Sequence, residues 1–134
     1  LMFDYSLTGL VTLLCLIVYI KMAYEVGGAR QKFSIPAPET NGPEEFTRYI
    51  RAQANTLETM MIFLPALWLF ALTISDLYAA AIGVFYPLSR FVYAKRYQAG
   101  ESRARAFTLG FMATNLLLAG ALIGLAHAAY ATYS

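Results

Sequence analysis

The sequence is short of charged residues, cysteine and histidine, and each shortage removes a class of function. Only 13% of its 134 residues are charged, and a formal net charge of +2 is too small to indicate a nucleic-acid-binding surface. No arginine-rich tract interleaved with aromatic residues occurs outside the apolar segments, so we expect no nucleic acid partner. The single Cys15 excludes an internal disulfide and provides no second thiol for a metal site. The single His127 is expected at a membrane interface rather than as a base, and we expect no bound metal.

Apolar sequence is what the chain has in abundance. Hydrophobic residues make up 59% of it and its mean hydropathy is +0.53, more than a small soluble domain tolerates. Four apolar stretches each approach the ~20 residues that cross a hydrocarbon core of ~30 Å. The first has no basic start and no obvious small-residue cleavage site, so we expect a retained helix and not a signal peptide. The sequence therefore predicts an all-α membrane protein, a single four-transmembrane-helix bundle over residues 1–134 with helices at about 5–27, 44–74, 77–97 and 103–131.

The segments between the apolar stretches predict the connections and the orientation. Gly27 to Glu45 is rich in proline and charge and is predicted to be a loop, whereas the second connection, near Ser75 and Asp76, is short enough for a tight antiparallel hairpin. The basic residues near the helix ends all belong to the first and third connections: Arg30, Lys32, Lys95, Arg96, Arg103 and Arg105. The positive-inside rule then predicts that these two loops are cytoplasmic and that both termini lie on the opposite side of a bacterial inner membrane or endoplasmic reticulum.

Prolines and glycines inside the apolar stretches predict local features of the helices. Pro65 and Pro87 each remove a backbone hydrogen bond, so kinks are expected at both. Gly120 and Gly124 form a GxxxG pair, which permits close packing of the last helix against a neighbour.

Polar residues recur at helical spacing in the second and third apolar stretches. At 100° per residue, Arg48, Arg51, Asn55 and Glu58 fall within about 80° of one another and share one face of a helix, while Gln53 points elsewhere. In the third stretch Arg90, Tyr93 and Tyr97 share a face in the same way. Two polar stripes can therefore oppose each other at membrane depth, where ionisable groups are expensive and usually mark a ligand or ion pathway.

Two interpretations account for these stripes. In the structural one, Arg51 and Glu58 neutralise each other within the bundle and the tyrosines sit in the headgroup belt. In the functional one, the arginines receive carboxylates, the glutamate receives an ammonium, and the asparagine and tyrosines receive amides. A small zwitterionic peptide carries that set of groups, so the inventory favours the functional interpretation.

Two motifs carry a resemblance to a known family. RYIRAQANTLE, with RFVYAKRY farther along, resembles the signature of the membrane-associated proteins in eicosanoid and glutathione metabolism, and the match extends over almost the whole chain. The resemblance implies a homotrimer with glutathione bound at each subunit interface. It also implies which residues bind the peptide. The γ-glutamyl end would be held by Arg51, Asn55, Glu58, Tyr93 and Tyr97. The glycyl carboxylate would be bound by Arg30 and Gln53. Arg48 and Arg90, on the same stripes, complete the expected binding set.

The same resemblance implies a reaction. An arginine at the start of the fourth helix stabilises the glutathione thiolate in this family, and Arg103 and Arg105 both flank the expected position, with a slight preference for Arg105. Gln31 and Thr59 depart from the pattern of the leukotriene-forming members. The expected function is a membrane glutathione transferase acting on lipophilic electrophiles, with peroxidase activity on lipid hydroperoxides. The alternatives are a prostaglandin-type isomerase and a non-catalytic lipid-binding protein, like the 5-lipoxygenase-activating member.

Overall fold

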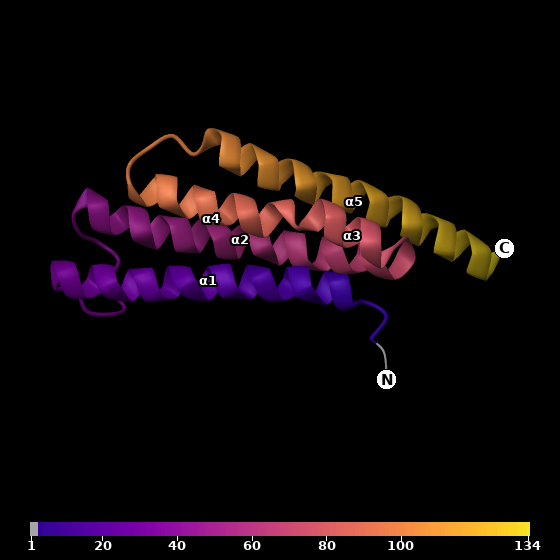
Figure 1. The fold of residues 1–134 in the computed structure, drawn as a ribbon, viewed down its shortest axis with the longest axis horizontal. Helices are drawn as coiled ribbons and strands as arrows, with labels where there is room; N and C mark the ends of the chain where they lie inside the picture. Colours follow the sequence, from indigo (N-terminus) through magenta and orange to yellow (C-terminus); the bar gives the residue numbers. More distant parts are fainter. Residues whose placement is uncertain (1–2) are drawn as a thin grey trace.

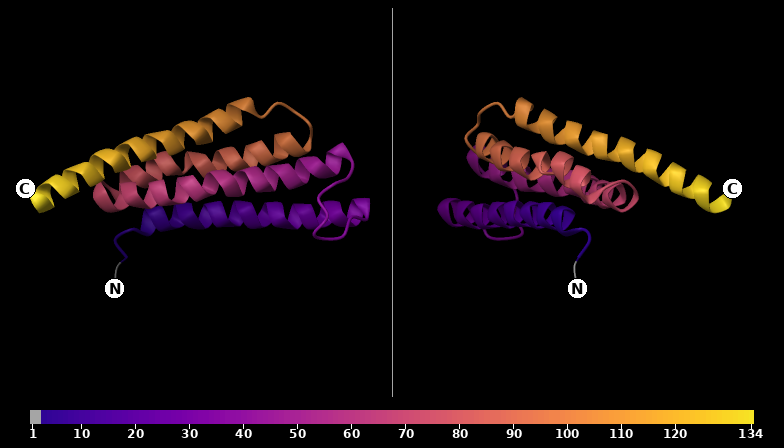
Figure 2. Two further views of the ribbon diagram at one scale, coloured as in Figure 1. Left: turned by 180° about the vertical axis from the view of Figure 1, so that it is seen from behind. Right: turned by 45° about the vertical axis from the view of Figure 1, so that its right-hand side comes forward.

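The computed structural model describes residues 3–134 and is helical between its loops. Within that range the helices are α1 (Ser6–Phe33), α2 (Glu44–Thr73), α3 (Asp76–Gly83), α4 (Phe85–Gln98) and α5 (Ala104–Tyr133), and no strand is present. Because α3 and α4 together form one span, the described chain has four helical segments long and apolar enough to cross a membrane. The helices run side by side, with the first and third loops at one end and both termini at the other (Figures 1 and 2). The predicted all-α four-helix membrane bundle is confirmed.

The first helix is longer than predicted. Gly27 does not begin the loop, since α1 continues to Phe33 and nothing surrounds the position where a side chain would stand at Gly27. The helix ends where Ser34 adopts a left-handed conformation with φ of 55°. The Ser34 N–H donates to the Gln31 carbonyl and the Ile35 N–H donates to the Arg30 carbonyl, which is the Schellman pattern of a helix end.

The third span is interrupted at Val84, between α3 and α4. Pro87 has no N–H to donate to the carbonyl one turn before it, which would be that of Gly83, so the regular ladder fails at this point. Pro65 lies inside α2, and that helix continues past it to Thr73. The predicted distortion is therefore seen as a break in the third span, while α2 remains a single helix.

The core forms around α2, which packs against each of the other helices. Phe63 of α2 stacks on Tyr86 of α4 with ring centroids 4.1 Å apart, and both side chains are buried. The predicted close approach of the last helix is confirmed, because a side chain at Gly120 would overlap the ring of Phe70 and one at Gly124 would overlap Thr73.

Hydrogen bonds close the end of the bundle that holds the termini. The Asp76 carboxylate, at the start of α3, accepts the backbone N–H groups of Leu7 at 3.3 Å and Thr8 at 2.8 Å. It therefore caps the start of α1, where these N–H groups have no partner within the helix. Nearby, the Trp68 indole donates to the Thr12 hydroxyl at 2.9 Å, which ties α2 to α1.

Candidate functional site

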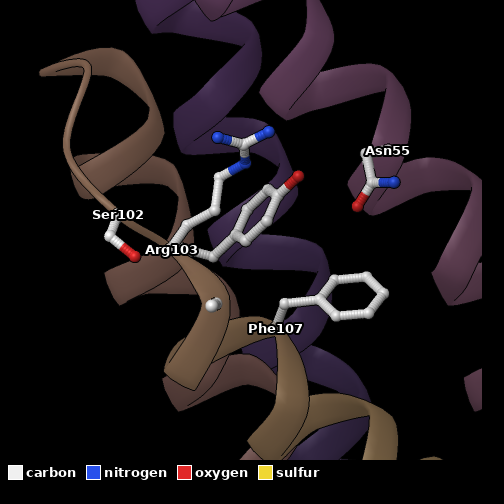
Figure 3. Close-up of a pocket in the computed structure, with 6 residues that line it drawn as sticks. Asn55, Ser102, Arg103 and Phe107 are labelled. Carbon is white, nitrogen blue, oxygen red and sulfur yellow. The ribbon is translucent and has the colours of Figure 1, made fainter.

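A polar pocket opens where the start of α5 faces the middle of α2. It has a volume of about 410 Å³ and is lined by Asn55, Tyr93, Ser102, Arg103, Ala104 and Phe107. Figure 3 shows Asn55 on α2 across the pocket from Arg103 and Phe107. Three of these residues, Asn55, Tyr93 and Arg103, belong to the predicted binding and catalytic sets, and they come from α2, α4 and the third loop.

A second cavity of about 420 Å³ adjoins the first at Arg103. Its lining contains four predicted site residues, Arg48, Arg51, Tyr97 and Arg103, together with Glu44, Thr47 and Gly100. The Arg103 guanidinium lies over the Tyr97 ring, 3.8 Å from the ring centroid, and Tyr97 in turn makes an edge contact with Tyr93. Arg103 thus stands between two cavities that together contain most of both polar stripes.

Arg90 is buried beneath this region, with 2% of its surface exposed. Its guanidinium donates to the Asn55 side-chain oxygen at 2.8 Å and lies 4.2 Å from the Tyr93 ring centroid. No carboxylate pairs with it anywhere in residues 3–134. Arg90 lies eight residues before the end of α4, about 12 Å into the bundle at ~1.5 Å per residue, where an arginine costs about 2.5–3.5 kcal/mol. The contacts show that Arg90 fixes the orientation of Asn55.

Arg48 holds the third loop through a hydrogen bond. Its Nε–H donates to the Gln98 carbonyl at 3.2 Å, and its guanidinium lies 3.5 Å from the Glu44 carboxylate. Gly100, with φ of +75°, passes directly over the guanidinium, so a side chain there would touch it. Arg48 lines the second cavity while anchoring the loop that leads to Arg103.

Arg103 and Arg105 face different cavities. Arg103 is the last residue of the third loop and has a non-helical backbone, whereas Arg105 lies in the first turn of α5. Arg103 lines both polar cavities, whereas Arg105 lines a separate groove with Leu88, Val92 and Leu109. The placement favours Arg103 as the arginine nearest the polar stripes, in contrast to the slight preference for Arg105 drawn from the sequence.

The chain is similar to known proteins over most of its length. The model of the MAPEG family matches residues 8–126. The chain belongs to the MAPEG family. It is 36% identical over 124 residues to microsomal glutathione S-transferase 2 of Mus musculus, covering 92% of this chain and 84% of the relative. It is 34% identical over 121 residues to leukotriene C4 synthase of Rattus norvegicus, covering 90% and 81%. An uncharacterized protein of Synechocystis is 41% identical over 118 residues, covering 87% and 86%. With its four apolar spans, this MAPEG member is an integral membrane protein.

Three residues of the predicted binding set, Arg30, Gln53 and Glu58, line neither of the two Arg103 cavities. One Nη of Arg30 donates to the carbonyls of Ile35 and Pro36, both at 3.4 Å, and of Glu39 at 2.6 Å. Gln53 is half-buried on another face of α2. Glu58 is exposed on α2 and forms no ion pair with Arg51 in the part of the chain that the structure describes.

The first loop is held by its own contacts beside Arg30. The Glu39 carboxylate accepts the N–H groups of Asn41 at 2.8 Å and Thr40 at 2.9 Å. These hydrogen bonds, with a smaller contribution from the charge of Arg30, hold the pKa of Glu39 below its usual range.

Several residues at the candidate site were not singled out from the sequence. Phe107 and Ser102 line the first pocket, and Thr56 accepts a 3.4 Å hydrogen bond from Arg90. Phe107 could have been found, because it lies four residues after Arg103 and therefore shares its face of α5. Thr56 lies one residue after Asn55, off the predicted stripe, and only the position of α4 brings Arg90 to it.

Proposed function

We propose that this MAPEG protein is a membrane glutathione transferase that conjugates glutathione to lipophilic electrophiles. The proposal depends above all on Arg103, whose guanidinium stands at the junction of two polar cavities and forms no salt bridge within residues 3–134. Relatives named glutathione S-transferase and leukotriene C4 synthase, matched over most of their length, support the same assignment.

The polar cavities match the groups of glutathione. Arg51, which lines the second cavity, would pair with a carboxylate of the γ-glutamyl residue. Glu58, exposed on α2 outside both cavities, would receive the γ-glutamyl ammonium. Asn55, held in place by Arg90, and the hydroxyl groups of Tyr93 and Tyr97 would bind the peptide amides.

Arg30 and Gln53 would contribute to the glutathione site of a neighbouring subunit in a homotrimer. They lie away from the Arg103 cavities of their own chain, so each would reach the glycyl carboxylate of glutathione bound to a neighbouring subunit. In the proposed orientation, the first and third loops and the mouth of the site face the cytoplasm. Native mass spectrometry of the solubilised protein would test both the trimer and any co-purified glutathione.

Arg103 would act on the sulfur. A thiol with a pKa near ~8.5 is mostly protonated at pH 7, and only the thiolate attacks. A guanidinium within ~4–6 Å favours the thiolate, and each unit by which it lowers the thiol pKa corresponds to about 1.4 kcal/mol. The thiol proton passes to water, the sulfur forms a bond to the electrophilic carbon, and the leaving group departs with the bonding electrons.

The same thiolate supports a second reaction, the reduction of lipid hydroperoxides. The sulfur attacks the terminal oxygen, the O–O bond breaks, and the alkoxide takes a proton to become an alcohol. A second glutathione then reacts with the glutathione sulfenic acid, which gives the disulfide and water.

A partly apolar cavity beside Phe107 would hold the lipophilic substrate. It has a volume of about 280 Å³, and its lining passes from Asn55 and Arg90 to the apolar side chains of Ile62, Phe111 and Leu118. The last three are on helix faces exposed to the surroundings of the chain, so a hydrophobic molecule could enter from the bilayer.

A conjugation assay tests the proposal. The purified protein is assayed with glutathione and 1-chloro-2,4-dinitrobenzene, alongside Arg103→Ala and the matched control Arg105→Ala. Loss of one donor that stabilises developing charge typically lowers kcat by about 10²–10³-fold, and we expect that loss for Arg103→Ala. Arg105→Ala should retain activity within about threefold, since Arg105 faces a different groove.

Other outcomes of this assay would change the conclusion. Loss of activity in Arg105→Ala with retention in Arg103→Ala would reverse the roles of the two arginines. Glutathione binding with no turnover of any electrophile or hydroperoxide would favour the second candidate, a non-catalytic lipid-binding protein, for which the apolar end of the Phe107 cavity is the supporting observation.

A further inference from the structure

A groove between α4 and α5 opens on another side of the third loop and α5 from the cavities assigned to glutathione, and Ser102 is the lining residue that it shares with them. The groove has a volume of about 730 Å³ and is walled by the apolar side chains of Leu88, Val92 and Leu109, with Arg96 and Arg105 also in its lining. Arg103 lines the cavities on the other side of α5. The proposed transferase reaction therefore leaves this groove and its two arginines unexplained.

The groove has the depth of one membrane leaflet. Arg96 lies in the last turn of α4 and Arg105 in the first turn of α5, so both stand at the loop end of the bundle. Val92, Leu88 and Phe85 precede Arg96 by four, eight and eleven residues. At ~1.5 Å per residue these positions lie about 6, 12 and 16 Å deeper. The deepest is close to half of a hydrocarbon core of ~30 Å.

Within residues 3–134, the apolar walls of the groove are left exposed and its arginines form no strong ion pair. Leu88 is 56% exposed and Leu109 is 44% exposed, so the apolar walls are uncovered. Arg105 has no ion-pair partner in the described part of the chain. Arg96 pairs with Glu101 at 3.5 Å, but both side chains are more than half exposed, and such pairs contribute little.

An occupant must therefore carry an anion at the loop end and an apolar chain about one leaflet long. Guanidinium groups bind phosphate through paired N–H donors, and basic pockets between membrane helices recognise anionic lipid headgroups. We propose that the groove between α4 and α5 binds an anionic phospholipid. Its phosphate pairs with Arg96 and Arg105, and one acyl chain lies along Val92, Leu88 and Leu109.

The bound lipid would join the two ends of the third loop. Arg96 precedes that loop and Arg105 follows it, so one phosphate between them fixes the separation of α4 and α5 at the loop end. Arg103 lies on this loop, immediately before α5. This inference does not rest on the proposed transferase activity, because the groove and the polar cavities share neither arginine.

Lipid binding is tested on the full-length protein in a neutral detergent. Phosphatidylglycerol and phosphatidylcholine with identical acyl chains are compared by native mass spectrometry and by the rise in melting temperature. We expect phosphatidylglycerol to bind at least about tenfold more tightly, and the double variant Arg96→Gln/Arg105→Gln to weaken that binding by about 30-fold. Lys95→Gln is the matched control, since it removes one charge from the same turn of α4 but Lys95 does not line the groove.

A second variant separates the apolar wall from the charges. Leu109→Trp fills the groove without changing charge, and it should reduce retention of phosphatidylglycerol while glutathione binding is unaffected. Equal binding of the two lipids, or a double variant that keeps the preference, would overturn the proposal. So would covalent dimers formed by Leu88→Cys protein in membranes, because a second copy would then cover the groove; Cys15 is 1% exposed and would not form them.

Discussion

The two ends of the bundle differ in how their polar side chains are paired. At the end that holds the termini, the Asp76 carboxylate accepts hydrogen bonds from two backbone N–H groups, and the Trp68 indole donates one to the Thr12 hydroxyl. At the loop end, Arg51, Arg90 and Arg103 stand beside cavities and form no salt bridge in the described chain. One end uses its polar groups to hold the fold, whereas the other also lines cavities with arginines that have no counter-charge within residues 3–134, which the proposed function assigns to glutathione.

The difference teaches how to distinguish structure from function within one small bundle. A polar group that is satisfied internally stabilises the folded state, so its removal should lower stability. A buried group that waits for a ligand costs stability, so its removal should preserve or raise stability and abolish binding. Substitutions at the two ends should therefore have opposite effects on stability and on binding.

The largest expected effect is on glutathione affinity in Arg90→Met. Methionine fills similar space without a charge, and Asn55 loses the 2.8 Å hydrogen bond that orients it. Hydrogen bonds to charged groups contribute about 1.5–3 kcal/mol, so calorimetry should show affinity reduced by about 10- to 100-fold. The melting temperature without glutathione should be equal or higher, because a buried unpaired charge has gone. A large fall in the melting temperature would mean that Arg90 stabilises the folded state and is not reserved for a ligand.

The next effect is on packing at the opposite end, in Gly120→Ala. The added methyl group would overlap the buried ring of Phe70, and overpacking of this kind typically costs about 1–3 kcal/mol. Gly27→Ala is the matched control, since nothing surrounds that position in α1 and alanine is the better helix former. Thermal denaturation in detergent should show a lower melting temperature for the first variant and an unchanged or higher one for the second. Equal behaviour would show that α5 does not need the close approach.

A smaller loss of stability is expected for Asp76→Asn. The amide keeps one acceptor oxygen but loses the negative charge at the start of two helices, α1 and α3. The melting temperature should fall by a few degrees, whereas Asp4→Asn, at an exposed position, should leave it unchanged. Conjugation activity measured at low temperature should be the same in both variants. An activity loss without a stability loss would contradict the division between the two ends.

The smallest effect concerns the first loop in Glu39→Gln. The pKa of Glu39 is lowered by the Asn41 and Thr40 N–H groups, so its contribution to stability is complete above the unfolded pKa of about 4.3 and is lost as the pH falls through the lower folded value. The wild type should therefore melt slightly above the variant at pH 7, and the difference should shrink as the pH falls below about 4.3 and vanish once the pH is below the lowered folded pKa. Melting curves across that range measure it, and a difference that persists in acid would assign the effect to packing instead of charge.

Most of the helical architecture could be predicted from the sequence, whereas the neighbours of the candidate site residues could not. Apolar length and proline position gave the four spans and the interruption near Pro87, because these depend on local composition. The end of α1 was missed since Gly27 resembles a loop signal although the helix passes through it. Local patterns determine where a helix can exist more reliably than where it stops.

Two further features depend on tertiary contact and could not be predicted from the local sequence. Arg103 and Arg105 are indistinguishable by residue type, and only the position of α5 between two grooves separates them. The capping role of Asp76 was also missed, because its partners Leu7 and Thr8 lie 69 and 68 residues away in the chain. Which stripe residues share a helix face could be predicted, but not the neighbour that each one meets.

The contact between Arg103 and Tyr97 limits the direction from which a ligand can approach. With the ring 3.8 Å from the guanidinium carbon, one flat side of the cation is shielded by π-electrons. All five N–H donors of a guanidinium lie in its plane, so they stay available around the rim. In the proposed reaction, the negatively charged sulfur would therefore meet the guanidinium at its edge, where the N–H donors point, and not through the face that Tyr97 covers.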